Sequence, residues 1–246
     1  WNQSSVLSVD RYRCFSQTQI YNIHAIPCSS FWLQLMNRPF ALQDMNEPSN
    51  MVNGHLDSGC PSDNSIVYTP GDEPLQTRTL CNTDKHHWSD HYDVHNMYGF
   101  TEAIATYNAM ATVRPNKRPF IISRSSFSGL GFYAGHWTGD VFSSWTDLRD
   151  SVPGFLEFSF YGVPMVGVDI CGFNGDTNDD LCARWQAVGA FYPFSRNHNT
   201  NSASAQDPAS RGGKVLTATK AAYYWRYKLL PYLYTLFYEA HVSGST

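Results

Sequence analysis

Charged and polar side chains follow short apolar runs at five places along the chain. They are Asp44 with Glu47, Arg124, Asp140, Asp169, and Arg196 with His198. In α/β barrels such side chains do the chemistry, because the loops after the strands form the open face. Two carboxylates are the minimum machinery for glycoside hydrolysis, since one attacks the anomeric carbon and the other protonates the leaving oxygen. The two arginines could supply the positive charge that lets these carboxyl groups ionise differently.

The apolar runs alternate with segments of helical character. The runs cover residues 39–42, 118–124, 133–140, 162–169 and 191–198, and long loops are expected at 49–86 and 199–214. Helices are predicted over residues 87–113, 144–160, 177–190 and 215–241, with Thr177 as the N-cap of the third and breaks or kinks at Pro153 and Pro231. This alternation predicts an α/β fold, the C-terminal portion of an incomplete (β/α)8 barrel. The expected division is a partial barrel over residues 41–246, with residues 1–40 unassigned.

Composition and charge exclude several partner classes. The 246 residues carry a net charge of −4 at pH 7, and no long basic run argues for nucleic acid. No apolar stretch is long enough to predict a membrane span, and the first residues lack the pattern of a signal peptide. Aromatic residues make up 15% of the chain, a content that suits ring-lined sugar clefts. No nucleotide-binding fingerprint occurs, so no cofactor is expected.

Six cysteines occur, and none forms a CxxC pair. The zinc-ribbon and thioredoxin-like classes therefore have no support. An even count permits disulfides but does not assign them, so the states of Cys14 and Cys28 stay open. One glycosylation sequon, Asn2-Gln3-Ser4, lies at the N-terminus.

Four blocks in order carry a family resemblance. They are DMNEPSN at 44–50, RPFIISRSSFSGLGFYAGHWTGD at 118–140, GVPMVGVDICGF at 162–173 and GAFYPFSRNHN at 189–199. Together they resemble glycoside hydrolase family 31, over about residues 41–246. The resemblance implies a retaining double displacement on α-glycosides, with Asp44 as nucleophile and Asp140 as general acid/base. It favours a maltase-type α-glucosidase that removes terminal α-1,4-linked glucose from maltose and malto-oligosaccharides, while an α-xylosidase or an α-1,6-preferring member stays open.

The same resemblance implies roles for further residues. The sugar-binding residues would be Met45, Arg124, Trp137, Asp169, Phe173, Arg196 and His198. It also implies the disulfides Cys60–Cys81 and Cys171–Cys182, and hence an oxidising compartment: secreted, vacuolar or lysosomal. The sequence departs from the family pattern at Leu42, where an aromatic residue is usual, at Phe132, where many relatives carry arginine, and over residues 1–40.

Three alternatives compete with this interpretation. His87, His91 and His95 share one face of the predicted helix at the spacing i, i+4, i+8, with His86 and Asp90 nearby, which could hold a metal ion. The change at Leu42 would suit a non-catalytic carbohydrate-binding relative or an inactive fragment. An oxidoreductase or another barrel enzyme is the third alternative, which no cofactor motif supports.

Overall fold

The computed structural model describes residues 40–61 and 74–245. Its strands are two or three residues long, and each lies within one of the predicted apolar runs or directly extends it. They are β1 Ala41–Gln43, β2 Ile121–Ser123, β3 Gly135–Trp137, β4 Val166–Gly167, β5 Asp169–Ile170 and β6 Arg196–Asn197. Residues 1–39, which include most of the unassigned segment, Cys14, Cys28 and the sequon, lie outside the described part of the chain.

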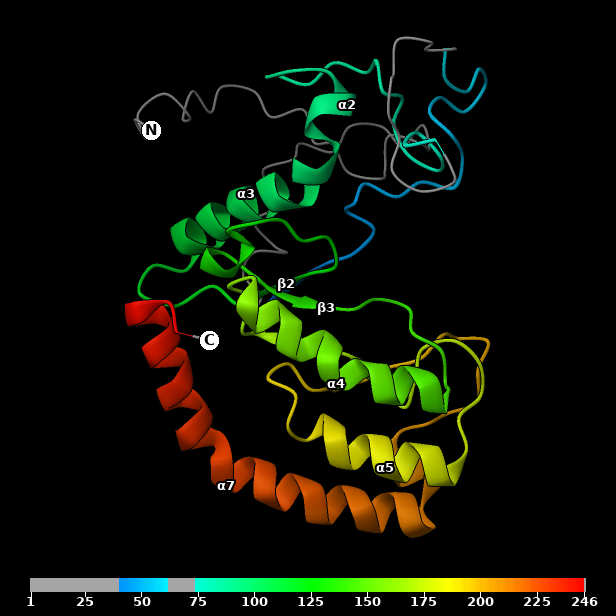
Figure 1. The fold of residues 1–246 in the computed structure, drawn as a ribbon, viewed down its shortest axis with the longest axis vertical. Helices are drawn as coiled ribbons and strands as arrows, with labels where there is room; N and C mark the ends of the chain where they lie inside the picture. Colours follow the sequence, from blue (N-terminus) through cyan, green and yellow to red (C-terminus); the bar gives the residue numbers. More distant parts are fainter. Residues whose placement is uncertain (1–39, 62–73, 246) are drawn as a thin grey trace.

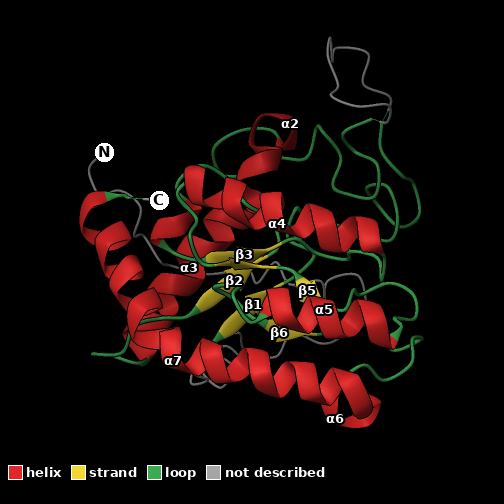
Figure 2. Cartoon of the chain, turned by 60° about the horizontal axis from the view of Figure 1, so that its bottom comes forward, coloured by secondary structure: helices red, strands yellow, loops and turns green. Residues whose placement is uncertain are grey.

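All the strand pairs are parallel. One sheet has the order β1-β2-β3-β4, and β5 pairs with β6 in a second sheet. Figure 2 shows these strands grouped at the centre, with helices α3, α4, α5 and α7 around them. Parallel strands joined by helices and covered by them on the outside form part of a (β/α) barrel, as predicted.

The helices and short helical turns are α2 His91–Val94, η3 His95–Met97, α3 Tyr98–Val113, η4 Leu130–Phe132, α4 Trp145–Phe160, α5 Asp179–Gly189, α6 Pro208–Arg211 and α7 Gly213–Ser243. The four predicted helical segments are present with shifted ends, and η4 and α6 lie outside them. Both α4 and α7 continue through their internal prolines. Figure 1 shows α7 changing direction about midway, where its colour turns from orange to red, in the region of the expected kink at Pro231.

Several predicted details are wrong. The run at 162–169 divides into β4 and β5, which belong to different sheets, because β4 pairs with β3 while Asp169 pairs with Arg196. The N-cap of α5 is Asn178 and not Thr177, since the Asn178 side chain accepts a hydrogen bond from Leu181 N at 3.0 Å. The loop predicted at 199–214 contains the short helix α6.

Two clusters of buried apolar side chains hold the helices on the strands. One cluster lies around β5, α5 and the start of α7 and includes Ile170, Trp185 and Val215. The other joins α3 to β2 through Met110 and Ile121. The strand ends that carry the candidate residues are therefore fixed from behind by packed cores.

Large apolar side chains are exposed along α7 from Tyr224 to Val242. They are Tyr224, Trp225, Tyr227, Leu230, Tyr232, Tyr234, Leu236, Tyr238 and Val242. These positions lie all round the helix and not on one stripe. Despite this content, no helix in the described ranges has the length and hydropathy that crossing a membrane requires.

Candidate active site

Asp44 and Arg124 follow neighbouring strands that end at the same level. The register pairs Gln43 of β1 with Ser123 of β2, so the next residue of each strand emerges at one edge of the sheet. Arg124 Nη1 lies 2.8 Å from Asp44 Oδ1, and the backbone nitrogen of Met45 donates to the same oxygen at 2.7 Å. Met45 has a φ of +58°, a left-handed conformation that is uncommon for a residue with a side chain. This turn directs the chain away immediately after Asp44.

Asp140 reaches the same guanidinium from the loop after β3. Its Oδ1 lies 4.0 Å from Arg124 Nη1, and the loop is held by a hydrogen bond from Asn174 Nδ2 to Asp140 O at 2.8 Å. Because both distances are measured from Arg124 Nη1, Asp44 Oδ1 and Asp140 Oδ1 can be at most about 7 Å apart. This limit is compatible with the spacing of about 5–5.5 Å between the two carboxyl groups of retaining glycosidases. Both carboxylates are about half exposed, so a ligand can reach them.

Asp169 and Arg196 form a buried ion pair across β5 and β6. Arg196 donates to Asp169 Oδ1 from Nε at 3.1 Å and from Nη2 at 2.6 Å. Burial raises the pKa of Asp169 to about 6, although the charge of Arg196 opposes this shift. Among the described residues nothing donates a hydrogen bond to the buried Asp169 Oδ2. An unpartnered buried carboxylate oxygen next to a cleft is a candidate acceptor for a ligand hydroxyl.

Two aromatic residues lie beside this ion pair. The Arg196 guanidinium stacks over Trp137, 5.2 Å from the ring centroid, and Trp137 Nε1 is a second buried atom without a partner within the described ranges. Phe173 packs against His198 with 5.3 Å between the ring centroids. Burial lowers the pKa of His198, as does the charge of Arg196, so the neutral imidazole is favoured.

The two groups of residues belong to one electrostatic site. The charges of Asp140 and Asp44 both raise the pKa of Asp169, and both also act to raise the pKa of His198. Carboxylates that influence both groups must lie near both of them, since such interactions weaken with distance. The structure therefore brings the candidate side chains of all five apolar runs close to one another, although Asp169 and Arg196 are the first residues of β5 and β6 and do not follow strands.

Gln206 supports the site, although no sequence pattern indicates it. Its buried Nε2 lies within hydrogen-bond distance of three carbonyls: Ile170 at 3.1 Å, Gly172 at 2.9 Å and His198 at 3.0 Å. These carbonyls belong to the segments that carry Asp169, Phe173 and His198. A glutamine in a predicted loop has no pattern that would reveal such a role.

Both implied disulfides are present. Cys171 and Cys182 join the end of β5 to α5, and their Cα atoms are 4.7 Å apart. Cys60 and Cys81 close part of the long loop, with 5.3 Å between their Cα atoms. Each pair lies in a segment that leads from a strand end of the site to the next helix.

The three histidines of the metal-binding alternative, His87, His91 and His95, do not come together as that alternative requires. His91 is buried and pairs with His86, with 2.9 Å between His86 Nε2 and His91 Nδ1, whereas His87 is exposed. Helical spacing fails here because regular helix begins only at His91 and changes to a 3-10 turn at His95. Burial lowers the pKa of His91 to about 4, with the charges of His95 and His86 contributing.

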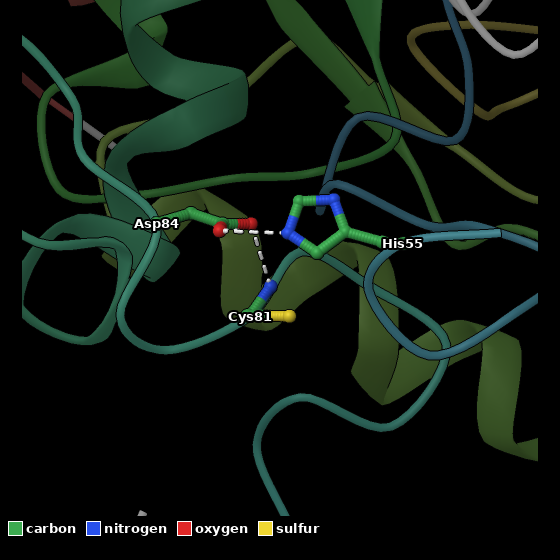
Figure 3. A group of neighbouring side chains, drawn as sticks. All are labelled: His55, Cys81 and Asp84. Carbon is green, nitrogen blue, oxygen red and sulfur yellow. Dashed lines mark hydrogen bonds and ion pairs between the residues drawn. The ribbon is translucent and has the colours of Figure 1, made fainter. Parts of the chain in front are cut away.

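In the described part of the chain, one other group brings three candidate metal ligands together. Figure 3 shows His55 and the backbone nitrogen of Cys81 directed at the carboxylate of Asp84, at 3.5 Å and 2.9 Å. The Cys81 sulfur is bonded to Cys60, so it is not a thiolate ligand. We interpret this group as an Asp84 contact that fixes the disulfide loop.

The fold and the site define the class of protein: part of a parallel α/β barrel with two carboxylates, Asp44 and Asp140, after the carboxyl ends of its strands. The chain belongs to the glycosyl hydrolases family 31, because residues 11–236 match the family's TIM-barrel domain. The match begins at residue 11, inside the segment that the sequence left unassigned.

Known proteins show the same relationship. The chain is 48% identical to lysosomal alpha-glucosidase of Bos taurus over 236 residues, which is 94% of this chain and 24% of that protein. It is 47% identical to intestinal sucrase-isomaltase of Homo sapiens, over 82% of this chain and 11% of that one. Among solved structures, the glucosidase II alpha subunit bound to Glc1Man2 superposes with a TM-score of 0.72 at 32% identity, over 87% of this chain and 22% of that chain. The chain thus spans about a quarter or less of these relatives.

Proposed function

We propose that this chain carries the catalytic site of a retaining α-glucosidase. The enzyme would release terminal non-reducing α-1,4-linked glucose from maltose and malto-oligosaccharides. The observation that carries the proposal is the shared contact of Asp44 and Asp140 with Arg124 Nη1, at 2.8 and 4.0 Å. It brings two acids from separate strands to within the range where one sugar ring fits between them.

In the proposed double displacement, Asp44 attacks the anomeric carbon. The guanidinium of Arg124 and the Met45 amide both contact Asp44 Oδ1 and hold the carboxyl group in place for this attack. Asp140 donates its proton to the leaving oxygen as the glycosidic bond breaks. It then takes a proton from the water that releases glucose from Asp44.

The sugar would lie between Asp169 and the aromatic residues. Asp169 Oδ2 and Trp137 Nε1, an acceptor and a donor without partners in the described structure, suit hydroxyls of one pyranose ring. Arg196 would brace Asp169, while Phe173, His198, Met45 and Arg124 would complete the pocket wall. No cofactor takes part in this scheme.

The choice of a maltase-type enzyme rests on the block DMNEPSN at residues 44–50. The 48% identity to a lysosomal alpha-glucosidase supports an α-glucosidase. The names of the first relatives and the two disulfides support a secreted, vacuolar or lysosomal compartment.

Covalent trapping on the full-length protein tests the proposal. A cyclitol epoxide should label Asp44 of the wild type, and maltose should be hydrolysed with release of α-glucose. Asp44→Ala should lose both labelling and turnover. If the wild type binds maltose without turnover, the protein is the non-catalytic carbohydrate-binding relative instead.

A further inference from the structure

Glu47 forms two hydrogen bonds with Arg124, the arginine that contacts both Asp44 and Asp140. Its Oε1 accepts from Arg124 Nε at 2.8 Å, and its Oε2 accepts from Arg124 Nη2 at 3.2 Å. Ser49 Oγ donates to Oε2 at 3.0 Å and steadies the carboxylate. This is the two-point pairing of a carboxylate with a guanidinium, which fixes direction as well as distance.

The two hydrogen bonds to Glu47 determine the direction of the third guanidinium nitrogen of Arg124, Nη1. A guanidinium is planar and rigid, so holding Nε and Nη2 leaves Nη1 on the opposite side. Nη1 is the atom that contacts Asp44 at 2.8 Å and lies 4.0 Å from Asp140. Because the group is rigid, any rotation of the guanidinium would change its two contacts with Glu47 and its contact with Asp44 together.

The arginine is also held from behind. Gly139 has a φ of +75°, and a Cβ at this position would lie 3.2 Å from Arg124 Cδ, closer than ordinary packing allows. The aliphatic part of Arg124 thus lies directly against the backbone that leads to Asp140. With its stem fixed by Gly139 and its head by Glu47, Arg124 has one orientation.

The titration behaviour agrees with a strong pairing. Burial acts to raise the pKa of Glu47, but the hydrogen bond and charge of Arg124, together with hydrogen bonds from the backbone and Ser49, hold this pKa below its ordinary value. Burial acts to lower the pKa of Arg124, and Glu47, with Asp44 and Asp140, raises it above its ordinary value. Both shifts favour the charged forms of the pair.

We propose that Glu47 is a positioning residue that orients Arg124 so that one guanidinium nitrogen serves both the nucleophile Asp44 and the acid/base Asp140. The role rests on the proposed function of these two aspartates. Glu47 itself does not touch the reacting atoms. The proposed sugar-binding roles do not include Glu47, and orienting Arg124 gives this residue a function.

Kinetics of Glu47→Gln in the full-length protein test this role. The amide keeps the shape but presents N–H groups to a donor, so one of the two contacts is lost. We expect kcat on maltose and the rate of labelling by the cyclitol epoxide each to fall about 100-fold, with KM within about threefold of the wild type, because misplacement of a group near 1 Å costs rate and not binding. Asp150→Asn, which breaks a surface pair with Arg149, is the matched control and should leave both rates unchanged.

A double-mutant cycle shows whether the effect passes through Arg124. Lysine cannot make the two-point contact with Glu47. In an Arg124→Lys background, Glu47→Gln should therefore lower kcat on maltose by less than about threefold. If the kcat loss of the double variant equals the product of the losses of the two single variants, the positioning role is wrong. It is also wrong if Glu47→Gln raises KM while kcat is unchanged. If Glu47→Gln does not fold, Ser49→Ala decides: kcat should fall about threefold with KM unchanged, and a wild-type kcat would overturn the role.

The two proposals fail in different ways. A wild type that hydrolyses no α-glycoside and is not labelled by the epoxide would overturn both the function and the role of Glu47. A wild type that is active, together with an equally active Glu47→Gln, would overturn the role of Glu47 alone.

Discussion

Arg196 makes two hydrogen bonds to a single oxygen of Asp169 and leaves the other oxygen buried without a donor among the described residues. Asp169 is 1% exposed, so its charge is costly even beside an arginine. This geometry explains both a binding function and a pH dependence. The free oxygen is available to a sugar hydroxyl, and the buried carboxyl titrates at a higher pH than an ordinary aspartate.

Asp169 should make the folded protein more stable at acid pH. Burial raises its pKa from 3.8 to about 6, so the folded state holds this proton more tightly than the unfolded chain. The contribution is complete below about pH 4 and is lost as the pH rises through 6, and it amounts to about 3 kcal/mol at most. Thermal unfolding of the full-length protein between pH 4 and pH 7 measures it.

Asp169→Asn is the variant that isolates this effect. The asparagine does not titrate, so the change in Tm between pH 4 and pH 7 should become smaller, even if Tm is lower throughout because Arg196 loses its partner. Asp150→Asn, at an exposed position on α4, should keep the wild-type dependence. Equal pH dependence in the Asp169→Asn variant and the wild type would show that Asp169 titrates normally.

Asp140→Ala should affect substrates according to their leaving groups. The leaving group of maltose is a glucose unit, which would depart as an alkoxide without protonation, so kcat/KM on maltose should fall by about 100-fold or more. The phenolates of activated aryl α-glucosides leave without protonation, so these substrates should be affected far less in the bond-breaking step. The measurement is kcat/KM over a series of aryl leaving groups, and equal losses across the series would remove Asp140 from the acid role.

The N-cap of α5 gives a test on the fold. Asn178 accepts from Leu181 N at 3.0 Å, so Asn178→Ala should lower the free energy of unfolding by about 1 kcal/mol. The neighbouring Thr177→Ala should cost less, because the Thr177 hydroxyl makes only a long 3.4 Å bond to a carbonyl. Thermal or denaturant unfolding compares the two variants. A larger loss of unfolding free energy in Thr177→Ala than in Asn178→Ala would show that Thr177 is the N-cap, as the sequence predicted.

The buried disulfide ties the Asp169 strand to α5. Cys171 and Cys182 are both 0% exposed and lie in the core cluster with Ile170 and Trp185. Replacing both with alanine should lower stability by about 2–4 kcal/mol and should lower Tm. A parallel Cys60→Ala, Cys81→Ala variant tests the outer loop, and an unchanged Tm for the buried pair would show that the core holds β5 without it.

The sequence predicts the strand ends well because each apolar run stops abruptly at a polar residue. Asp44 and Arg124 directly follow β1 and β2 and Asp140 follows β3, as their runs indicated, whereas Asp169 is the first residue of β5. The break between β4 and β5 has no such signal, since Val166, Val168 and Ile170 read as one continuous buried strand. Only the neighbouring strands decide the division, and pairing partners are not local information.

The contacts between distant charged residues could not be predicted in the same way. Glu47 belongs to a recognisable block, but its pairing with Arg124 spans 77 positions and depends on the register of β1 with β2. Gln206 is equally remote from the carbonyls near its amide. The disulfides implied by the family resemblance are confirmed, whereas the roles of the candidate residues stay predictions until the variants are measured.

The exposed aromatic side chains of α7, from Tyr224 onward, have a practical consequence for anyone who expresses these 246 residues alone. A helix that is apolar on every side is normally enclosed, and a patch of this kind left in water promotes self-association. Light scattering of such a preparation should show large assemblies at micromolar concentration. Glutamate in place of Tyr227 and Tyr238 should reduce them, which would make the isolated barrel segment tractable for binding studies.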